Sequence, residues 1–300
     1  MRMQYNILGK SDLRISEIGL GAMSLVQGHD QTNGYIIKHA QELGINYLDT
    51  SDLYDKGKNE ELIGRLIGDD RDKWILASKV GNKWRPDGSG WDWAPDKAYI
   101  LKSIDESLKR LNTDYLDLYQ LHGGTIEDPF DEIVEAFELL VKQGKIRYYG
   151  ISSIRPKVFL NYAQNSNIVS DMMQYSIFDR RPEEYFPQLQ ESGISVLARG
   201  TIAQGLLLKK PAQKYLSYSV HEVLEIQKKL AEISSKYDLN RLALALKYPL
   251  LHSPVACSVV GIRTREQINS LDEVFDDMQK IDLSVYADLI EDMPTIRYEV

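Results

Sequence analysis

The sequence predicts an α/β protein, a (β/α)8 (TIM) barrel preceded by an amino-terminal β-hairpin. Eight strand-like segments recur along the 300 residues, and helix-period segments lie between most of them. Strands that alternate with helices indicate a parallel sheet, and eight such units at this length favour a closed barrel over an open doubly wound sheet. No G-x-G-x-x-G fingerprint follows an early strand, so the usual signal of a Rossmann domain is absent.

The elements are expected in the following order. The hairpin should pair residues 5–8 with 13–16 through a turn at 9–12. Barrel strands are expected at residues 18–21, 46–49, 74–78, 115–121, 146–151, 169–173, 195–198 and 256–260. Clear helical periodicity covers 97–111 and 130–143, and a polar, Tyr-rich loop at 209–219 precedes a further helix at 220–236. Because no composition shift or linker divides the chain, we predict one domain over residues 1–300.

Composition and charge restrict the function classes. The net charge of -8 argues against a broad nucleic-acid surface, and no apolar run is long enough to cross a membrane. Cys257 is the one cysteine, which excludes an internal disulfide, and its apolar surroundings favour a buried, inert thiol over a reactive one. We therefore expect a cytoplasmic protein, a monomer or weak homo-oligomer, that acts on a small molecule.

Four polar residues stand out because each lies where a strand-like segment gives way to a loop, or within the first such loop. They are Asp49, Tyr54, Lys79 and His122. In a barrel of alternating strands and helices, the loops after the strands share one face, where catalytic groups collect. These four side chains are therefore predicted to meet at one point.

Their chemistry suits proton transfer to a carbonyl group that becomes an alcohol. A phenol is a poor proton donor near neutral pH unless a fixed cation stabilises its phenolate, and Lys79 can supply that cation for Tyr54. Asp49 can balance the ammonium, and a neutral imidazole at His122 can orient the substrate oxygen. None of the four can supply a hydride, so a nicotinamide cofactor is required.

The chain resembles an aldo-keto reductase, most of all the bacterial reductases of broad or unassigned substrate. The resemblance extends over essentially the whole chain and is carried by motifs in the expected order: 8–13 with 18–21, Asp49-Thr50 with Tyr54, Lys79, 107–111 with 117–122, 150–152, Gln174-Tyr175 and 205–207. It implies a (β/α)8 barrel that binds NADPH in an extended pose, with Asp49, Tyr54, Lys79 and His122 as the catalytic tetrad.

The resemblance also implies cofactor contacts, position by position. Those at the nicotinamide are Ser152, Ser153, Gln174 and Arg199; those along the pyrophosphate are Gly200, Thr201, Gln204 and Leu206; those at the adenosine phosphate are Gly261, Arg263 and Gln267. Three positions depart from the family pattern. Ser153 replaces an asparagine, Arg199 replaces an aromatic ring, and Ser270-Leu271 replaces a Glu-Asn pair.

Several alternatives stay open from the sequence. Trp84, together with Trp91 and Trp93, could line an apolar substrate pocket or simply pack the long loop after Lys79. Arg199 could pair with a carboxylate instead of facing the cofactor.

The sequence also bears on metal binding and on the class of function. Asp52 and Asp55 flank Tyr54, but no His or Cys completes a ligand set, so we expect solvated loop charges and no metal. The leading function is NADPH-dependent reduction of aldehydes or ketones, and the alternative is an NADPH-binding redox-sensing or regulatory subunit with little turnover. An isomerase or aldolase on the same barrel would leave Arg263 unexplained.

Overall fold

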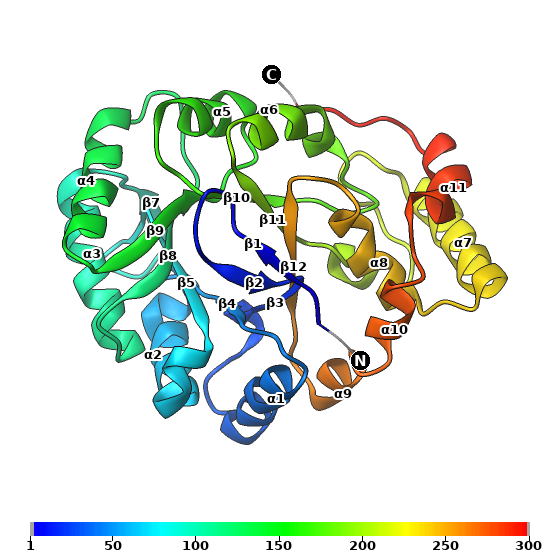
Figure 1. Cartoon of the computed structure of the whole chain (residues 1–300), viewed down its shortest axis with the longest axis horizontal. Helices are drawn as coiled ribbons and strands as arrows, with labels where there is room; N and C mark the ends of the chain where they lie inside the picture. The colour runs from blue at the N-terminus through cyan, green and yellow to red at the C-terminus, as the bar shows by residue number, and fades with distance from the viewer. Residues whose placement is uncertain (1–2, 299–300) are drawn as a thin grey trace.

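The structure, a computed structural model that describes residues 3–298, is a closed barrel of eight parallel strands surrounded by helices (Figure 1). In chain order the barrel strands are β3 (Ile18–Gly21), β4 (Tyr47–Asp49), β5 (Ile75–Val80), β8 (Leu116–Leu121), β9 (Ile146–Ile151), β10 (Ser170–Gln174), β11 (Ser195–Arg199) and β12 (Val255–Gly261). The barrel closes where β12 pairs with β3, with Ser258 opposite Ile18. The predicted fold class is confirmed, and each observed strand overlaps its predicted range.

The amino-terminal hairpin closes one end of the barrel. Strands β1 (Tyr5–Ile7) and β2 (Arg14–Ser16) pair antiparallel, as predicted, and lie across the barrel centre in Figure 1. The buried hairpin residues Leu8 and Leu13 pack with barrel-interior side chains such as Leu118 and Leu197. The hairpin is also bonded to late strands, since the Asn6 side chain donates to the Ala256 carbonyl at 2.8 Å.

The turn of this hairpin requires a glycine. Gly9 has φ +53°, and a Cβ there would lie 2.1 Å from the Val169 carbonyl oxygen. Its N–H donates to Ser195 Oγ at 2.7 Å, so the turn rests directly on the start of β11. Because this end is filled by the hairpin, a ligand site is expected at the opposite, carboxyl end of the strands.

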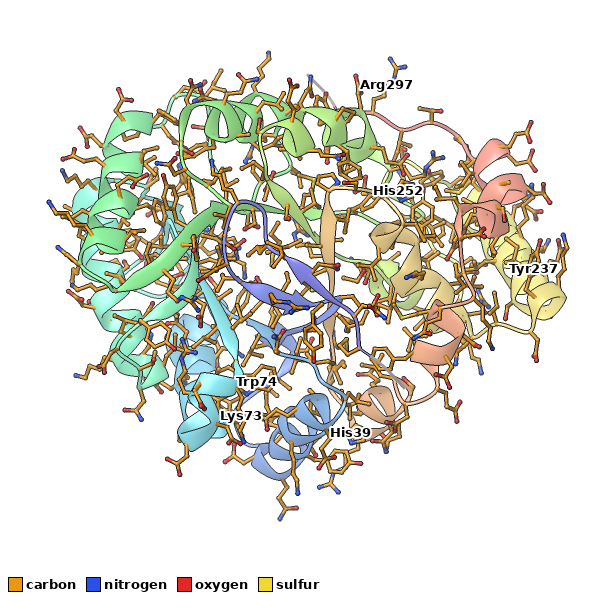
Figure 2. The ribbon with its side chains drawn as sticks, viewed as in Figure 1. His39, Lys73, Trp74, Tyr237, His252 and Arg297 are labelled. Carbon is orange, nitrogen blue, oxygen red and sulfur yellow. The ribbon has the colours of Figure 1, made fainter. Side chains whose placement is uncertain are left out.

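The outer helices bury one apolar face against the barrel. They are α1 (Asp30–Glu42), α2 (Lys58–Ile67), α3 (Lys97–Leu111), α4 (Phe130–Lys142), α5 (Pro156–Asn165), α6 (Phe186–Glu191), α7 (Val220–Tyr237), α8 (Arg241–Leu250), α9 (Arg265–Asn269), α10 (Val274–Met278) and α11 (Ala287–Glu291). Figure 2 shows many nitrogen- and oxygen-tipped side chains projecting outward from this ring. Within residues 3–298, no helix is both long and apolar enough to span a membrane.

Local signals explain where the clearest helices begin and end. The α3 helix begins after Asp96, whose carboxylate accepts the Tyr99 N–H, and ends at Asn112 in the left-handed region. The α7 helix begins with a capping box formed by Ser219 and Glu222. The predicted bounds of α3 are confirmed, while α4 ends one residue earlier and α7 one residue later than predicted.

A second hairpin, absent from the sequence prediction, covers the loop after β5. Strands β6 (Asn82–Trp84) and β7 (Trp91–Trp93) pair antiparallel, with Trp84 opposite Trp91. The Pro-Asp-Gly run between them is a turn signal flanked by aromatic residues, so the pattern was present in the sequence. Each strand has only three residues, which is too short for a convincing alternation.

Short 3₁₀ segments complete the chain. These are η1 (Ala22–Ser24), η3 (Gly68–Lys73), η4 (Arg181–Tyr185) and η6 (Leu283–Tyr286), with two irregular turns at η2 (Tyr54–Gly57) and η5 (Ala203–Gly205). The predicted loop at 209–219 contains neither helix nor strand, and an isolated bridge joins Tyr215 to Tyr218. Cys257 is fully buried, and burial raises the pKa of its thiol well above the ordinary value. Both observations agree with the expected buried, inert thiol.

Candidate active site

The structure brings the four predicted catalytic residues together at the carboxyl end of the barrel. Asp49 is the last residue of β4 and Lys79 is the penultimate residue of β5. His122 directly follows β8, and Tyr54 begins the turn after β4. All four therefore lie at the end of the barrel opposite the hairpin, as predicted.

A buried ion pair is the centre of this group. The Lys79 side chain is only 1% exposed, and its Nζ donates to Asp49 Oδ2 at 2.5 Å. The same ammonium donates to the Thr50 carbonyl at 2.8 Å and to the Tyr54 hydroxyl at 3.3 Å. Burial is the largest single influence and lowers the pKa of Lys79, but the charges and hydrogen bonds of Asp49 and Tyr54 together outweigh it, so the pKa is raised. Lys79 is therefore a fixed cation in contact with the Tyr54 hydroxyl.

His122 faces Tyr54 as a neutral imidazole. The two ring centroids are 6.1 Å apart and the rings are nearly perpendicular, at 87°. Burial first, and then the positive charges of Lys79 and Arg199, lower the pKa of His122 to about 3. At neutral pH the imidazole thus carries one N–H and no charge, which suits a hydrogen bond to a substrate oxygen.

Ser51 is a neighbour of His122 that the sequence reasoning missed. Its buried hydroxyl lies 3.2 Å from His122 Nδ1, and it also accepts the Leu53 N–H at 3.1 Å. The one proton of the Ser51 hydroxyl is directed either to Asp52 Oδ1, at 3.3 Å, or to Nδ1, and donation to Nδ1 places the ring proton on Nε2. No pattern in the sequence links two residues that lie 71 positions apart.

Asp52 is buried, so its interpretation as a solvated loop charge was wrong. Its relative exposure is 9%, because the segment after β4 folds back over β5 and the Asp52 N–H reaches the Lys79 carbonyl. Burial, and then the charge of Glu60, raise the pKa of Asp52 to about 8. Glu60 is itself buried and accepts bonds from Ser78 at 2.5 Å and Arg110 at 2.7 Å. Asp55, by contrast, is exposed as expected.

The residues expected at the nicotinamide lie at the ends of three adjacent strands. Ser152 is half-buried after β9 and donates to the Met172 carbonyl at 3.2 Å. Ser153 is buried, and its hydroxyl accepts the Arg155 N–H at 3.2 Å. Gln174 ends β10 and its amide donates to the Tyr215 hydroxyl at 3.4 Å. The Ser153 hydroxyl is thus occupied by backbone, whereas Ser152 and Gln174 are partly open to a ligand.

Arg199 is an exposed cation at the end of β11. It forms no ion pair with another residue of the described chain, so the alternative of a carboxylate partner is not what the structure shows. Its charge is one of the causes that lower the pKa of His122. Arg199 therefore adds positive potential to the site.

The segment expected along the pyrophosphate follows Arg199 in an irregular turn. Gly200 and Gln204 are exposed and both have positive φ, +71° and +57°. Thr201 Oγ1 is buried and has no hydrogen-bond partner among residues 3–298. Leu206 is fully buried, so its side chain belongs to the core and only its backbone can contact a ligand.

The residues expected at the adenosine phosphate follow β12. Arg263 is exposed, and its backbone N–H donates to Gln267 Oε1 at 2.8 Å. A Cβ at Gly261 would lie 2.6 Å from Ser24 Oγ, so a glycine is needed there for close approach. Arg265 lies over the Tyr35 ring at 4.8 Å, which leaves Arg263 as the freer of the two guanidinium groups.

The three tryptophans of the β6–β7 hairpin have different surroundings. Trp84 donates its indole N–H to the Leu53 carbonyl at 3.1 Å, directly before Tyr54. Trp93 packs inward and donates to Asp128 at 2.7 Å, whereas Trp91 is 48% exposed. Trp84 is thus fixed beside Tyr54 by its bond to Leu53, whereas Trp93 packs the loop itself.

Comparison with known proteins identifies the family of the chain. The model of the Aldo/keto reductase family matches residues 17–286. The chain is similar to the uncharacterized oxidoreductase YqkF of Bacillus subtilis, with 51% identity over 276 residues and 89% of each chain covered. It is 27% identical to the aldo-keto reductase yakc [NADP(+)] of Schizosaccharomyces pombe, covering 87% of this chain and 83% of the relative. Among solved structures it is similar to the holo form of aldo-keto reductase AKR11C1 from Bacillus halodurans, with TM-score 0.92, 45% identity and 99% of both chains covered.

Proposed function

The chain belongs to the aldo/keto reductase family, and we propose that it is an NADPH-dependent oxidoreductase that reduces aldehydes or ketones to alcohols. The observation that carries the proposal is the contact between a buried, charge-balanced ammonium and a phenol, Lys79 Nζ to Tyr54 OH at 3.3 Å. A neutral imidazole faces the same phenol. This arrangement suits a phenol that donates a proton, not a nucleophile or a metal site.

In the proposed mechanism Tyr54 donates a proton to the carbonyl oxygen. The phenolate that forms would lie 3.3 Å from the Lys79 ammonium, an attraction of ~5 kcal/mol at an effective dielectric constant of about 20. Asp49 holds the ammonium in place, and the 2.5 Å bond keeps it from turning away when the phenol loses its proton. Bound NADPH supplies the hydride that the carbonyl carbon receives.

His122 is proposed to orient the carbonyl group. An uncharged ring can donate Nε2–H to the oxygen without competing with Tyr54 as the acid, because its pKa of about 3 keeps it neutral. The Asn82 side chain, which donates to the His122 carbonyl at 2.9 Å, holds the backbone of this residue. Trp84, bonded to the residue before Tyr54, is proposed as a wall of the substrate site.

The open polar groups at the carboxyl end of the barrel fit a phosphorylated dinucleotide. Ser152, Gln174 and the exposed Arg199 support contacts with the nicotinamide. The Thr201 hydroxyl, which has no hydrogen-bond partner among residues 3–298, supports a contact with the pyrophosphate. The exposed Arg263 guanidinium suits the 2′-phosphate that distinguishes NADPH from NADH. The Schizosaccharomyces pombe relative is named for NADP(+), which supports the same choice.

A panel of aldehydes and ketones, followed by NADPH absorbance, tests the proposal. Tyr54→Phe is the matched control, because it keeps the ring and removes only the hydroxyl. We expect several members of the panel to oxidise NADPH with the unmodified protein and at least roughly 10²-fold more slowly with the variant. Failure of every member, including in a single turnover of bound NADPH with a reactive aldehyde, would instead favour the redox-sensing or regulatory alternative.

A further inference from the structure

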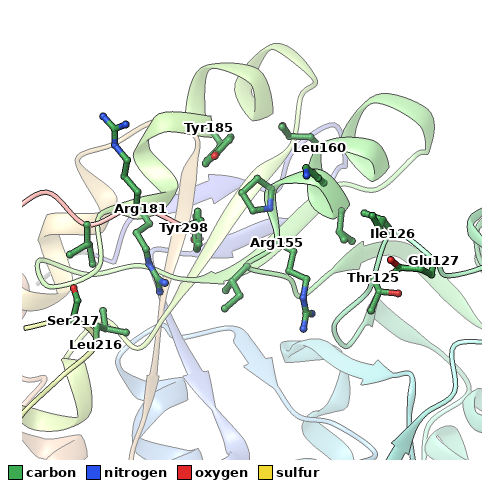
Figure 3. Close-up of a pocket in the computed structure, with 16 residues that line it drawn as sticks. Thr125, Ile126, Glu127, Arg155, Leu160, Arg181, Tyr185, Leu216, Ser217 and Tyr298 are labelled. Carbon is green, nitrogen blue, oxygen red and sulfur yellow. The ribbon is translucent and has the colours of Figure 1, made fainter. Parts of the chain in front are cut away.

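A cavity of about 1090 Å³ lies beside the proposed active site and contains none of its residues. Its walls come from the loop after β8 at 125–127, the start of α5, η4, the loop at 216–217 and the segment 296–298. Figure 3 shows Arg181, Tyr298, Leu216 and Ser217 on one side and Arg155, Thr125 and Glu127 on the other. The volume slightly exceeds the roughly 300–1,000 Å³ typical of sites for small organic ligands.

The lining is cationic although the chain as a whole carries a net charge of -8. Arg155, Lys157, Arg181 and Arg297 face one acidic residue, Glu127. Arg181 is neutralised by Asp179 through bonds of 2.7 and 2.6 Å. The other three cations form no ion pair within residues 3–298, and Arg297 projects from the outer edge of the molecule in Figure 2. Arg155 and Lys157 are therefore the two uncompensated cations at the start of α5.

The remainder of the lining is largely apolar. Ile154, Leu160, Leu216 and Tyr185 contribute carbon surface, and the Tyr298 ring lies 4.6 Å from the Arg181 guanidinium carbon. A small inorganic ion would leave this apolar surface in contact with water. A ligand that fits both parts has an oxyanion at one end and a flat or apolar body.

Two walls of the cavity continue into the proposed nicotinamide site. The Arg155 N–H donates to Ser153 Oγ, and its guanidinium donates to the Gly124 carbonyl at 3.0 Å, two residues beyond His122. On the other wall Leu216 follows Tyr215, whose hydroxyl accepts from Gln174. The cavity and the proposed nicotinamide site therefore share neighbouring residues on two walls, and the wall at Arg155 carries the α5 cations.

We propose that this cavity receives the anionic end of the substrate, so that the enzyme prefers carbonyl compounds with a carboxylate or phosphate on an aromatic or apolar body. The inference rests on the proposed reductase function. It assigns Arg155 and Lys157 to substrate selection and gives them no part in the chemical step.

The test compares isosteric pairs of aldehydes at two lengths. These are 4-formylbenzoate with 4-formylbenzamide, and 4′-formylbiphenyl-4-carboxylate with its carboxamide, each assayed for kcat/KM with NADPH. In the unmodified protein we expect the carboxylate to exceed its amide by about tenfold at one or both lengths, the low end for a hydrogen bond to an exposed charge. A phosphonate of the longer body separates preference for carboxylate from preference for any oxyanion, and either result is consistent with the site.

Lys157→Met removes one exposed cation without breaking a described hydrogen bond, and we expect it to lower the carboxylate-to-amide ratio several-fold, mainly through the carboxylate rate, because Arg155 stays in place. Lys142→Met is the matched control, because Lys142 is also exposed but ends α4, at the opposite end of the barrel. Lys157→Arg should restore the preference. Equal rates for carboxylate and amide at both lengths, or equal ratios in the two methionine variants, would overturn the proposal. If no aldehyde is reduced, the reductase function itself fails. Calorimetry then tests the cavity separately, by measuring the binding of 4′-methylbiphenyl-4-carboxylate to the Lys157→Met and Lys142→Met proteins. Only weaker binding to Lys157→Met than to Lys142→Met supports the anion site.

Discussion

Asp52 should make the protein less stable as the pH rises above neutrality, and Asp52→Asn should remove that dependence. In an unfolded chain an aspartate ionises near its ordinary pKa of 3.8, whereas burial and Glu60 raise the pKa of Asp52 to about 8 in the folded protein. Between these values the folded state keeps a proton that the unfolded state has lost. The stability contributed by this group is therefore complete below pH 3.8 and is lost as the pH rises toward 8.

The size of the effect follows from the two pKa values. Each pH unit inside the interval costs about 1.36 kcal/mol, so the passage from pH 6 to pH 8 should cost about 2 kcal/mol, allowing for partial ionisation at the upper end. An asparagine has the shape of the protonated acid and does not titrate. The difference in unfolding free energy between Asp52→Asn and the unmodified protein should therefore increase by about 2 kcal/mol over this range.

Urea unfolding of both proteins at pH 6, 7 and 8 measures this difference. Asp69→Asn is the control, because it makes the same substitution at an exposed carboxylate, in the η3 segment. The control should follow the unmodified protein at each pH. A difference for Asp52→Asn that stays constant from pH 6 to pH 8 would refute the assignment of a buried, protonated carboxyl group.

Four further outcomes are expected at the site. Tyr54→Phe should bind NADPH nearly as well as the unmodified protein while carbonyl reduction falls at least roughly 10²-fold; full activity would remove Tyr54 from the proposed role. Arg199→Tyr should shrink the preference for NADPH over NADP⁺, since a cation near the ring disfavours the positively charged oxidised form; titration of both cofactors measures the ratio, and an unchanged ratio would place Arg199 away from the ring. Arg263→Ala should weaken NADPH about 10- to 100-fold and barely affect NADH, and equal losses would show that the phosphate lies elsewhere. Ser51→Ala, which removes the hydroxyl 3.2 Å from His122 Nδ1, should lower kcat several-fold with NADPH affinity kept, and a kcat equal to that of the unmodified protein would show that the imidazole needs no partner there.

The barrel and the four candidate catalytic residues could be predicted because both follow from local patterns. Each barrel strand is a short apolar run with a polar residue at its carboxyl end, and the fold then brings those ends together. Asp49, Lys79 and His122 needed only their place relative to a strand. The resemblance to a family added the cofactor positions, and the structure places Ser152, Gln174 and Arg199 on neighbouring strand ends.

The features that escaped prediction depend on contacts between distant segments. Asp52 looks like any loop aspartate until the chain folds back and buries it beside Glu60. Leu206 was expected to contact the cofactor, but its side chain is in the core, and only the turn geometry shows this. The cation cluster at Arg155 and Lys157 is unremarkable in the sequence, because the other walls of its cavity come from segments up to about 140 residues away.

The hairpin that closes the barrel also constrains the order in which the chain can fold during synthesis. Asn6 bonds to Ala256, 250 positions later, and Gly9 bonds to Ser195. These partners leave the ribosome long after the hairpin itself, so the contacts of the hairpin with β11 and β12 can form only after those strands have been made. Strands β3 to β11 can pair with their neighbours as they emerge, whereas β1 and β2 have no complete surface to cover before β12 arrives. The hairpin is thus synthesised before the barrel strands but completes its native contacts only after them.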